Sequence, residues 1–151
     1  DYWSVDTIRR WRNGGKFDGK MLTEDQKHIY NIYQRILTLC NKEKAITEGE
    51  FFDLMYANAN GWRFNEHKQY TFLRKAGKEL LFIIVNFDHI SVDVAINVPS
   101  HAFDFLQIPQ MDVYPAVDLL TGKTESISLL PYKATEISVE GYSGKILKIK
   151  L

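Results

Sequence analysis

The chain is poor in several features that mark particular classes of protein. It has one cysteine among 151 residues, Cys40, which leaves no pair for an internal disulfide and too few thiols for a cysteine-rich zinc site. Lysine plus arginine balance aspartate plus glutamate at 19 each, so the chain has no overall basic field to attract nucleic acid or an anionic membrane surface. We therefore expect neither nucleic acid nor a membrane as a partner.

Long apolar segments are also missing. No run approaches the roughly 18 residues needed to cross a bilayer. The first residues lack the basic and apolar regions of a signal peptide. The sequence does not indicate a cellular compartment. If the chain is part of a longer protein, the targeting signal of that parent would lie outside this sequence, and the parent could be extracytoplasmic or cytoplasmic.

The composition fits a globular domain. Hydrophobic residues make up 45% and charged residues 25%, which excludes the disordered and collagen-like classes. Aromatic residues make up 13%, and they bury the largest area per side chain. The chain therefore has the material for a sizeable core.

The first third of the chain predicts one short and one long helix. Ser4 can cap a short helix over residues 5–12, which Asn13-Gly14-Gly15 ends. Thr23 and Gln26 have the spacing of a capping box at the start of a long amphipathic helix. Its apolar stripe consists of Ile29, Ile32, Tyr33, Ile36, Leu37 and Cys40. Two helices cannot close a core by themselves, so this stripe has to pack on something else.

From Glu50 onward the hydrophobic period changes to two residues. Turns rich in Gly, Asn, Asp and Pro separate short alternating segments, which is typical of an antiparallel sandwich or barrel. The segments are residues 51–56, 69–75, 79–87, 92–98, 113–120, 124–130, 133–139 and 145–151. Pro115, within the fifth, suggests an edge strand or a late strand start. The predicted fold is mainly β, an antiparallel Greek-key β-sandwich of about eight strands preceded by the two helices.

One predicted strand has no polar face. Residues 80–85 are apolar without interruption, and residues 70–73 nearly so. Continuous apolarity in an antiparallel sheet means that both faces are covered. A second sheet can cover one face, and the other needs the amphipathic helix or a domain outside this sequence. Burying three side chains there is worth on the order of 5–9 kcal/mol, which is too much to leave exposed.

The order of several motifs carries a family resemblance. Residues 30–40, with residues 1–4 and 13–19 before them, look like the last barrel helix of the alpha-amylase family of glycoside hydrolases and the lead into it. Residues 45–51 resemble the junction into that family's C-terminal domain, residues 69–75 and 79–88 its central hairpin, and residues 118–122 and 130–132 its second half. The chain departs from the family at residues 100–111, an insertion, and in the strand after Gly144, which many members lack.

The resemblance implies a division of the chain and a role for each part. Residues 1–45 would be the last helical segment of a truncated (β/α)₈ barrel, and residues 46–151 a C-terminal β-sandwich domain. Trp3 and Trp11 would contact the absent barrel. Family members hydrolyse or transfer α-glucosidic bonds by a retaining route, with two carboxylates on barrel loops that precede this segment.

The resemblance also implies a function. The chain alone is expected to be inactive and to need no cofactor, whereas its parent is expected to be a retaining α-glycosidase or alpha-amylase-type hydrolase. The expected role of the chain is that of a non-catalytic C-terminal domain, which stabilises the catalytic barrel of an enzyme acting on α-glucans.

The acidic, histidine and cysteine residues of the chain do not indicate a catalytic or metal site. Glu48 and Glu50 have the residue types of an acid–base pair, but no pocket accompanies them, and solvated charge is the simpler interpretation. The four histidines are scattered without a second ligand at helical spacing, so no metal is expected. Cys40 lies on the apolar stripe, where a free cysteine acts as a small hydrophobe.

Loop aromatics are the remaining candidates for binding. Sugar rings stack their C–H faces on aromatic side chains, and Trp62, in a polar loop beside Arg63, is the best placed residue for this. Tyr142, in the turn between the last two strands, is the second candidate. For each, the alternative is a loop anchor packed on the sheet. The alternative function is thus a carbohydrate-binding module that contacts malto-oligosaccharides.

Three partners are expected on these grounds. The first is the missing catalytic barrel of the same polypeptide, and the second is an α-glucan. The third is a second copy of the chain, because an exposed barrel-facing patch promotes self-association.

Overall fold

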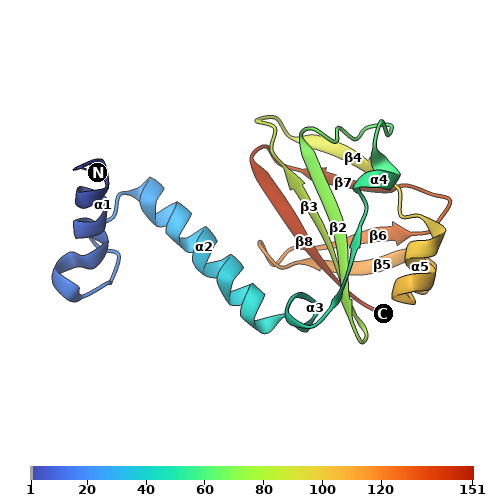
Figure 1. Ribbon diagram of the computed structural model, residues 1–151, viewed down its shortest axis with the longest axis horizontal. Helices are drawn as coiled ribbons and strands as arrows, with labels where there is room; N and C mark the ends of the chain where they lie inside the picture. Colours follow the sequence, from blue (N-terminus) through green and yellow to red (C-terminus); the bar gives the residue numbers. More distant parts are fainter. Residues whose placement is uncertain (1) are drawn as a thin grey trace. The chain divides into compact units, whose positions relative to one another are not determined.

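The computed structural model describes residues 2–151, and their side chains from Ser4 onward. Contacts divide the chain into two units, residues 1–39 and 40–151. The first unit is helical, and the second contains all the strands (Figure 1).

The helical unit consists of α1 (Tyr2–Arg12), the 3-10 turn η1 (Asn13–Gly15) and most of α2 (Glu24–Lys42). Because α1 begins at Tyr2, Ser4 lies inside it, and the prediction that Ser4 caps the helix is wrong. A cap marks a helix start only where the preceding residues leave helical geometry, and here they keep it. Asn13 and Gly14, with φ of 42° and 64°, end α1 in the left-handed region as expected.

The predicted capping box at the start of α2 is confirmed. The backbone N–H of Thr23 donates to Oε1 of Gln26 at 3.0 Å, and the backbone N–H of Gln26 donates to Oγ1 of Thr23 at 3.3 Å. This exchange satisfies two of the donors that a helix start leaves without partners. The helix then continues for 19 residues, none of which is buried.

The second unit contains eight strands and three short helices. In chain order these are α3 (Lys44–Thr47), β1 (Glu50–Asp53), α4 (Met55–Asn58), β2 (Gln69–Ala76), β3 (Glu79–Asn86), β4 (Val92–Ile96), α5 (Ser100–Leu106), β5 (Met111–Asp118), β6 (Thr124–Leu129), β7 (Thr135–Val139) and β8 (Ser143–Lys150). All strand pairs are antiparallel. The predicted fold class, a mainly β antiparallel sandwich after two helices, is confirmed.

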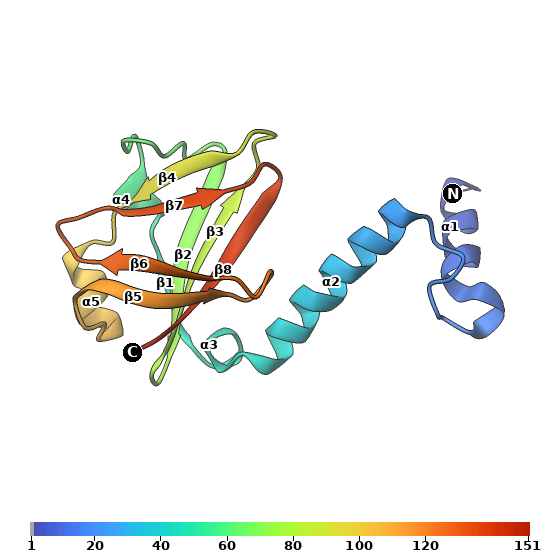
Figure 2. The ribbon, with the colours of Figure 1, turned by 180° about the vertical axis from the view of Figure 1, so that it is seen from behind.

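The topology is a set of nested strand pairs. The six-stranded sheet has the order β1-β2-β3-β8-β5-β6, and β4 pairs with β7 in a second sheet. β3 pairs with β8, β4 with β7 and β5 with β6, so each later pair lies inside the earlier one along the chain. Figures 1 and 2 show β4 and β7 side by side, and the large sheet is not closed into a barrel.

The main core lies between the two sheets. From β3 it takes Leu80, Phe82 and Ile84, which are fully buried and alternate with the outward residues of the same strand. The facing residues of the second sheet include Val94 and Ile137. Each sheet therefore has one face in the core and the other face directed outward.

The outer face of β3 is covered by a helix that the sequence did not predict. Leu81 and Ile83 are buried in one cluster with Ala45 of α3, and Ile46 of the same helix packs against this cluster. The Arg74 guanidinium holds α3 in place by donating to the backbone oxygens of Ala45 and Gly49 at 2.8 and 2.7 Å. The expectation that both faces of this strand are covered is therefore met in part within the chain.

Two details of the strand prediction were wrong. The strand expected over residues 51–56 ends at Asp53, whose carboxylate accepts the backbone N–H of Met55 at 3.0 Å and so begins the turn into α4. β5 is not an edge strand, because it lies between β8 and β6. Pro115 is tolerated there because the pairing with β8 begins one residue later, at Ala116. The insertion at residues 100–111 contains α5, which places Phe103 and Leu106 in the core.

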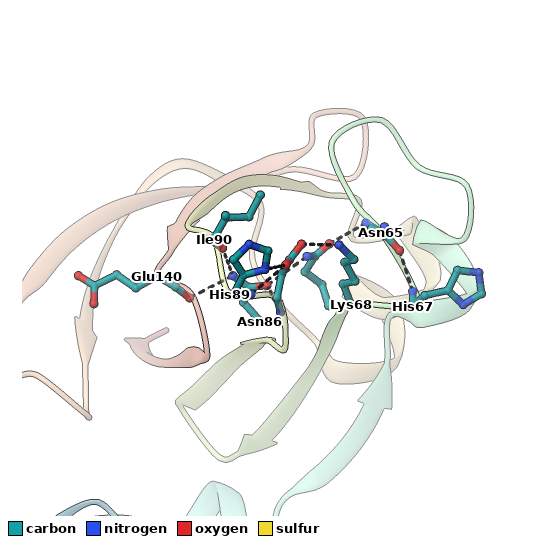
Figure 3. Close-up of polar contacts among 9 residues, drawn as sticks. Asn65, His67, Lys68, Asn86, His89, Ile90 and Glu140 are labelled. Atoms are coloured by element: carbon teal, nitrogen blue, oxygen red, sulfur yellow. Dashed lines mark hydrogen bonds and ion pairs between the residues drawn. The ribbon is translucent and has the colours of Figure 1, made fainter. Parts of the chain in front are cut away.

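A buried polar network joins the loop after β3 to neighbouring turns (Figure 3). The amide of Asn86, which is 1% exposed, donates to the backbone oxygens of Ile90 and Glu140 at 2.8 and 3.1 Å. Its side-chain oxygen accepts from Gln69 Nε2 and from the backbone N–H of Asp88. The network therefore fixes the end of β3 to the turn before β8.

The carboxylate of Asp88 extends this network to a charged partner. It is buried, and its Oδ2 lies 2.7 Å from Lys68 Nζ. The hydrogen bond from Lys68 lowers the pKa of Asp88 below its ordinary value, against the opposing effect of burial. The ionised form is thus favoured in the folded chain.

This pKa shift predicts how stability depends on pH. A carboxyl with a depressed folded pKa contributes its full stabilisation above its unfolded pKa, about 3.9, and loses it as pH falls through the lower folded value. We expect Asp88→Asn to be less stable than the wild type at pH 7, and the difference to shrink below about pH 4. Urea unfolding at a series of pH values measures this, and a difference that stays constant down to pH 2 would contradict it.

Candidate functional site

Two surfaces of the chain have features of a binding site. The first is the outer apolar face, defined here as the outward side chains of the large sheet that α3 leaves uncovered. It consists of Phe51 of β1, Tyr70 and Phe72 of β2, Val85 of β3 and Ile146 of β8.

The outer apolar face has aromatic rings in contact with each other and with solvent. The ring centroids of Phe51 and Phe72 are 5.3 Å apart, and those of Tyr70 and Phe72 are 5.6 Å apart. Phe51 is 47% exposed and Tyr70 is 38% exposed. Exposed aromatics that cluster in this way are typical of a surface on which another protein part packs.

Charged residues border the part of the large sheet that α3 covers, next to the outer apolar face. Lys148 Nζ lies 2.7 Å from Glu43 and 3.1 Å from Glu79. Burial lowers the pKa of Lys148, but its hydrogen bonds to these two carboxylates outweigh that effect and raise the pKa. The ammonium therefore stays charged and fixes the segment before α3 to β8.

The helical unit carries unburied apolar side chains of its own. The predicted stripe of α2 is exposed at Ile29, Ile32, Tyr33, Ile36 and Leu37, with exposed fractions of 37–65%. In α1, Trp11 packs its ring edge on Phe17 at 4.9 Å between centroids, but both remain exposed. The side chain of Trp3, the other tryptophan expected to contact a barrel, lies outside the described residues.

The second surface is built around Trp62, the first of the two sequence-predicted sugar contacts. Trp62 is 70% exposed, and the guanidinium carbon of Arg63 lies 4.9 Å from the centre of its ring. Arg63 is held in turn by the second sheet: its Nε donates to the backbone oxygen of Asp93 at 3.0 Å, and its Nη1 lies 3.2 Å from Glu136. The exposed Trp62 ring, backed by the Arg63 guanidinium, is termed the Trp62 platform.

A polar hollow adjoins this platform. It has a volume of about 260 Å³ and is lined by Arg63, Asp93, Glu136, Ile137 and Ser138. Asp93 and Ser138 lie opposite each other in the pairing of β4 with β7, and the Ser138 hydroxyl donates to the Asp93 carboxylate at 2.5 Å. A guanidinium, two carboxylates and a hydroxyl beside an aromatic ring are the groups that bind sugar hydroxyls. The sequence found Trp62 and its neighbour Arg63 but not Asp93, Glu136 and Ser138, because these three come from strands far along the chain.

Tyr142 lies elsewhere in the second unit. It is 78% exposed and occupies the turn between β7 and β8 in the left-handed region, with φ of 47°. Its backbone N–H donates to the backbone oxygen of Asp88 at 2.7 Å. No ring contact joins Tyr142 to Trp62 in the described part of the chain, so the two candidates do not form one stacked platform.

The other weighed residues do not gather into a site. Within residues 2–151, no group of three or more His, Cys, Asp and Glu side chains is placed to hold a metal ion. Glu50 lies at the start of the edge strand β1, and Cys40 is a free thiol. Among the described helices, none is long and apolar enough to span a membrane.

Neither a protein-family model nor a curated protein sequence matches the chain. Solved structures of two alpha-amylases and of a trehalose-6-phosphate hydrolase do share its fold, over 87–89% of its length. The chain spans only 20–27% of the length of those proteins, as expected for a structure similar to their C-terminal region.

Three of these structures illustrate the similarity. The maltogenic alpha-amylase AmyB from Thermotoga neapolitana matches with a TM-score of 0.63 at 14% identity, over 87% of this chain and 27% of its own. The alpha-amylase from Geobacillus thermoleovorans, complexed with acarbose, matches with a TM-score of 0.59 at 12% identity, over 89% of this chain and 26% of its own. The trehalose-6-phosphate hydrolase TreA from Bacillus licheniformis matches with a TM-score of 0.53 at 18% identity, over 87% of this chain and 20% of its own. At such identities the likeness is one of fold.

Proposed function

We propose that this chain is the C-terminal part of an alpha-amylase-like glycoside hydrolase that acts on α-glucans. In this proposal the helical unit contributes the last helix of the catalytic barrel. The sandwich is a non-catalytic domain that packs against the barrel and stabilises it. The retaining carboxylate pair belongs to the preceding part of the polypeptide, so the chain alone is inactive.

The observation that carries this proposal is the unburied apolar surface on both units. The stripe of α2 has no buried residue, although its large aliphatic and aromatic side chains recur every three or four residues, as in a core-facing helix. The outer apolar face adds Phe51 and Tyr70. Burying such a side chain stabilises a protein by about 1.5–3 kcal/mol. In this proposal, a barrel of the same polypeptide covers these side chains and so provides that stabilisation.

The gene itself tests the proposal. The DNA upstream of the Asp1 codon should continue in frame with a barrel pattern of alternating strands and helices. The longer polypeptide should hydrolyse a nitrophenyl malto-oligosaccharide, whereas the 151-residue chain should not. A start codon next to Asp1, or turnover by the 151-residue chain, would overturn the proposal.

The same surface predicts that the chain self-associates when produced alone. We expect the 151-residue chain to bind a hydrophobic dye and to form dimers or larger species in analytical ultracentrifugation. Ile32→Gln with Ile36→Gln should reduce both effects, because these residues lie on the exposed stripe of α2. The matched control is Asn31→Gln on the same helix. A wild-type chain that is monomeric at high concentration and binds no dye would count against the proposal.

A second candidate function is contact with the glucan itself, and the Trp62 platform favours it. An exposed indole supplies the apolar face on which a pyranose stacks, and the hollow beside it supplies hydrogen-bonding groups. A measurable affinity for malto-oligosaccharides would make the sandwich a carbohydrate-binding module as well as a stabilising domain.

Substitution of Trp62 tests this second function. Trp62→Ala should lower the affinity for maltoheptaose by about tenfold or more, because aromatic stacking is the main apolar contact of such a site. Tyr132→Ala, at an exposed aromatic outside the hollow, is the matched control for loss of such a side chain. Isothermal titration calorimetry gives the affinities, and equal binding by wild type and Trp62→Ala would show that the platform has no such role.

A further inference from the structure

A second cavity lies next to the Trp62 hollow. It has a volume of about 330 Å³ and opens between the second sheet and the β5–β6 hairpin with the start of β8. Asp93 and Ser138 line both this cavity and the hollow beside Trp62. The hydrogen-bonded Asp93–Ser138 pair thus lies between two adjoining depressions on one side of β4 and β7, the pair of strands seen in Figure 2.

The second cavity has polar groups that the fold does not use. The side chains of Ser91, Lys123, Glu140 and Ser143 line it, and no hydrogen bond or ion pair engages them within the described residues. Lys145 and Glu125 also line it but bind each other at 2.7 Å. The unused groups include a donor cation, an acceptor carboxylate and two hydroxyls.

This mixture of groups defines the chemistry of a ligand. An anionic ligand would meet Glu125 and Glu140, and a metal ion would find no cluster of ligands in the described chain. A neutral molecule with many hydroxyls can donate to the carboxylates and accept from Lys123 and the serines. Sugars have this property, and the cavity volume falls at the lower end of the range for ligand sites.

We propose that the two depressions form one groove that binds an oligosaccharide chain, with Trp62 at one end and the Lys123–Glu140 cavity at the other. The proposal rests on the glucan contact proposed above for Trp62, and extends it from one sugar ring to several. Glu136 of β7 and Glu140, the residue after this strand, are four residues apart, or roughly 13 Å at the rise of a strand, which exceeds the length of a single pyranose.

The groove predicts that affinity increases with the length of the sugar chain. The full 151-residue chain should bind maltoheptaose about tenfold more tightly than maltose, and bind glucose least, in calorimetric titrations. Ser91→Phe fills the second cavity without removing a charged group, and it should bring maltoheptaose to the affinity of maltose. Lys123→Ala with Glu140→Ala should do the same, and Lys133→Ala, outside the lining, is the control.

The outcomes separate the groove from the functions already proposed. If Ser91→Phe and the double variant leave maltoheptaose binding unchanged, or if maltose and maltoheptaose bind equally well, the groove is wrong while the Trp62 contact stands. If the wild-type chain binds no malto-oligosaccharide, both sugar proposals fail and the stabilising role is unaffected. Circular dichroism melts of each variant establish that it is folded.

Discussion

Replacing Phe82 by alanine is expected to lower the free energy of unfolding by about 3–5 kcal/mol, which is the usual cost of removing a buried phenylalanine. Phe82 is fully buried on the inner face of β3, in the middle of the large sheet. The neighbouring strands β2 and β8 hold the backbone on both sides, so the cavity cannot easily collapse. Urea unfolding followed by circular dichroism measures the change.

Phe51→Ala is the matched control on the opposite face. Phe51 is 47% exposed in this chain, so its loss should cost less than about 1 kcal/mol. In a longer polypeptide with the barrel present, the same substitution should become costly, because the ring would then be buried. Equal costs for Phe82→Ala and Phe51→Ala in the 151-residue chain would show that the outer apolar face is already part of a core.

Replacing Asn86 by alanine is expected to lower the free energy of unfolding by about 3–4 kcal/mol, because several buried groups lose their partners at once. The backbone oxygens of Ile90 and Glu140 would each lose a donor. Gln69 and the backbone N–H of Asp88 would lose their acceptor. The substitution therefore disconnects three segments that the network in Figure 3 joins.

Asn97→Ala is the matched control for the loss of stability expected in Asn86→Ala. Asn97 is exposed, and its backbone groups, not its side chain, bind Asn58. Its substitution should change the unfolding free energy by less than about 0.5 kcal/mol. An Asn86 variant as stable as the Asn97 variant would mean that water replaces the lost partners without cost.

The strands could be predicted from sequence because their signal is local. The alternation of Val92, Val94 and Ile96 is visible within a few residues, and the register of β4 confirms it. The short helices were missed for the same reason, since α3 and α4 have four residues each and α5 has seven. A helix of this length shows too few turns for its period to be recognised. The cover over Leu81 and Ile83 could therefore not be assigned to α3.

The candidate site was predictable only in its aromatic part. Trp62 could be identified because a large indole in a polar loop contrasts with its neighbours. Glu136 and Ser138 reach the same place through the pairing of β7 with β4, whose residues lie far apart in the chain. An alternating pattern identifies a strand but does not indicate which other strand it pairs with. The polar half of the site therefore could not be predicted from the sequence.

The position of β8 affects how this domain is made in the cell. The last strand of the chain lies between β3 and β5 and bridges the two halves of the large sheet. Strands β1–β7 are therefore synthesised before the strand that joins the two halves of the sheet, and the backbone N–H and C=O groups along the facing edges of β3 and β5 have no strand partner until β8 follows. We therefore expect the large sheet to be completed only after β8 has left the ribosome.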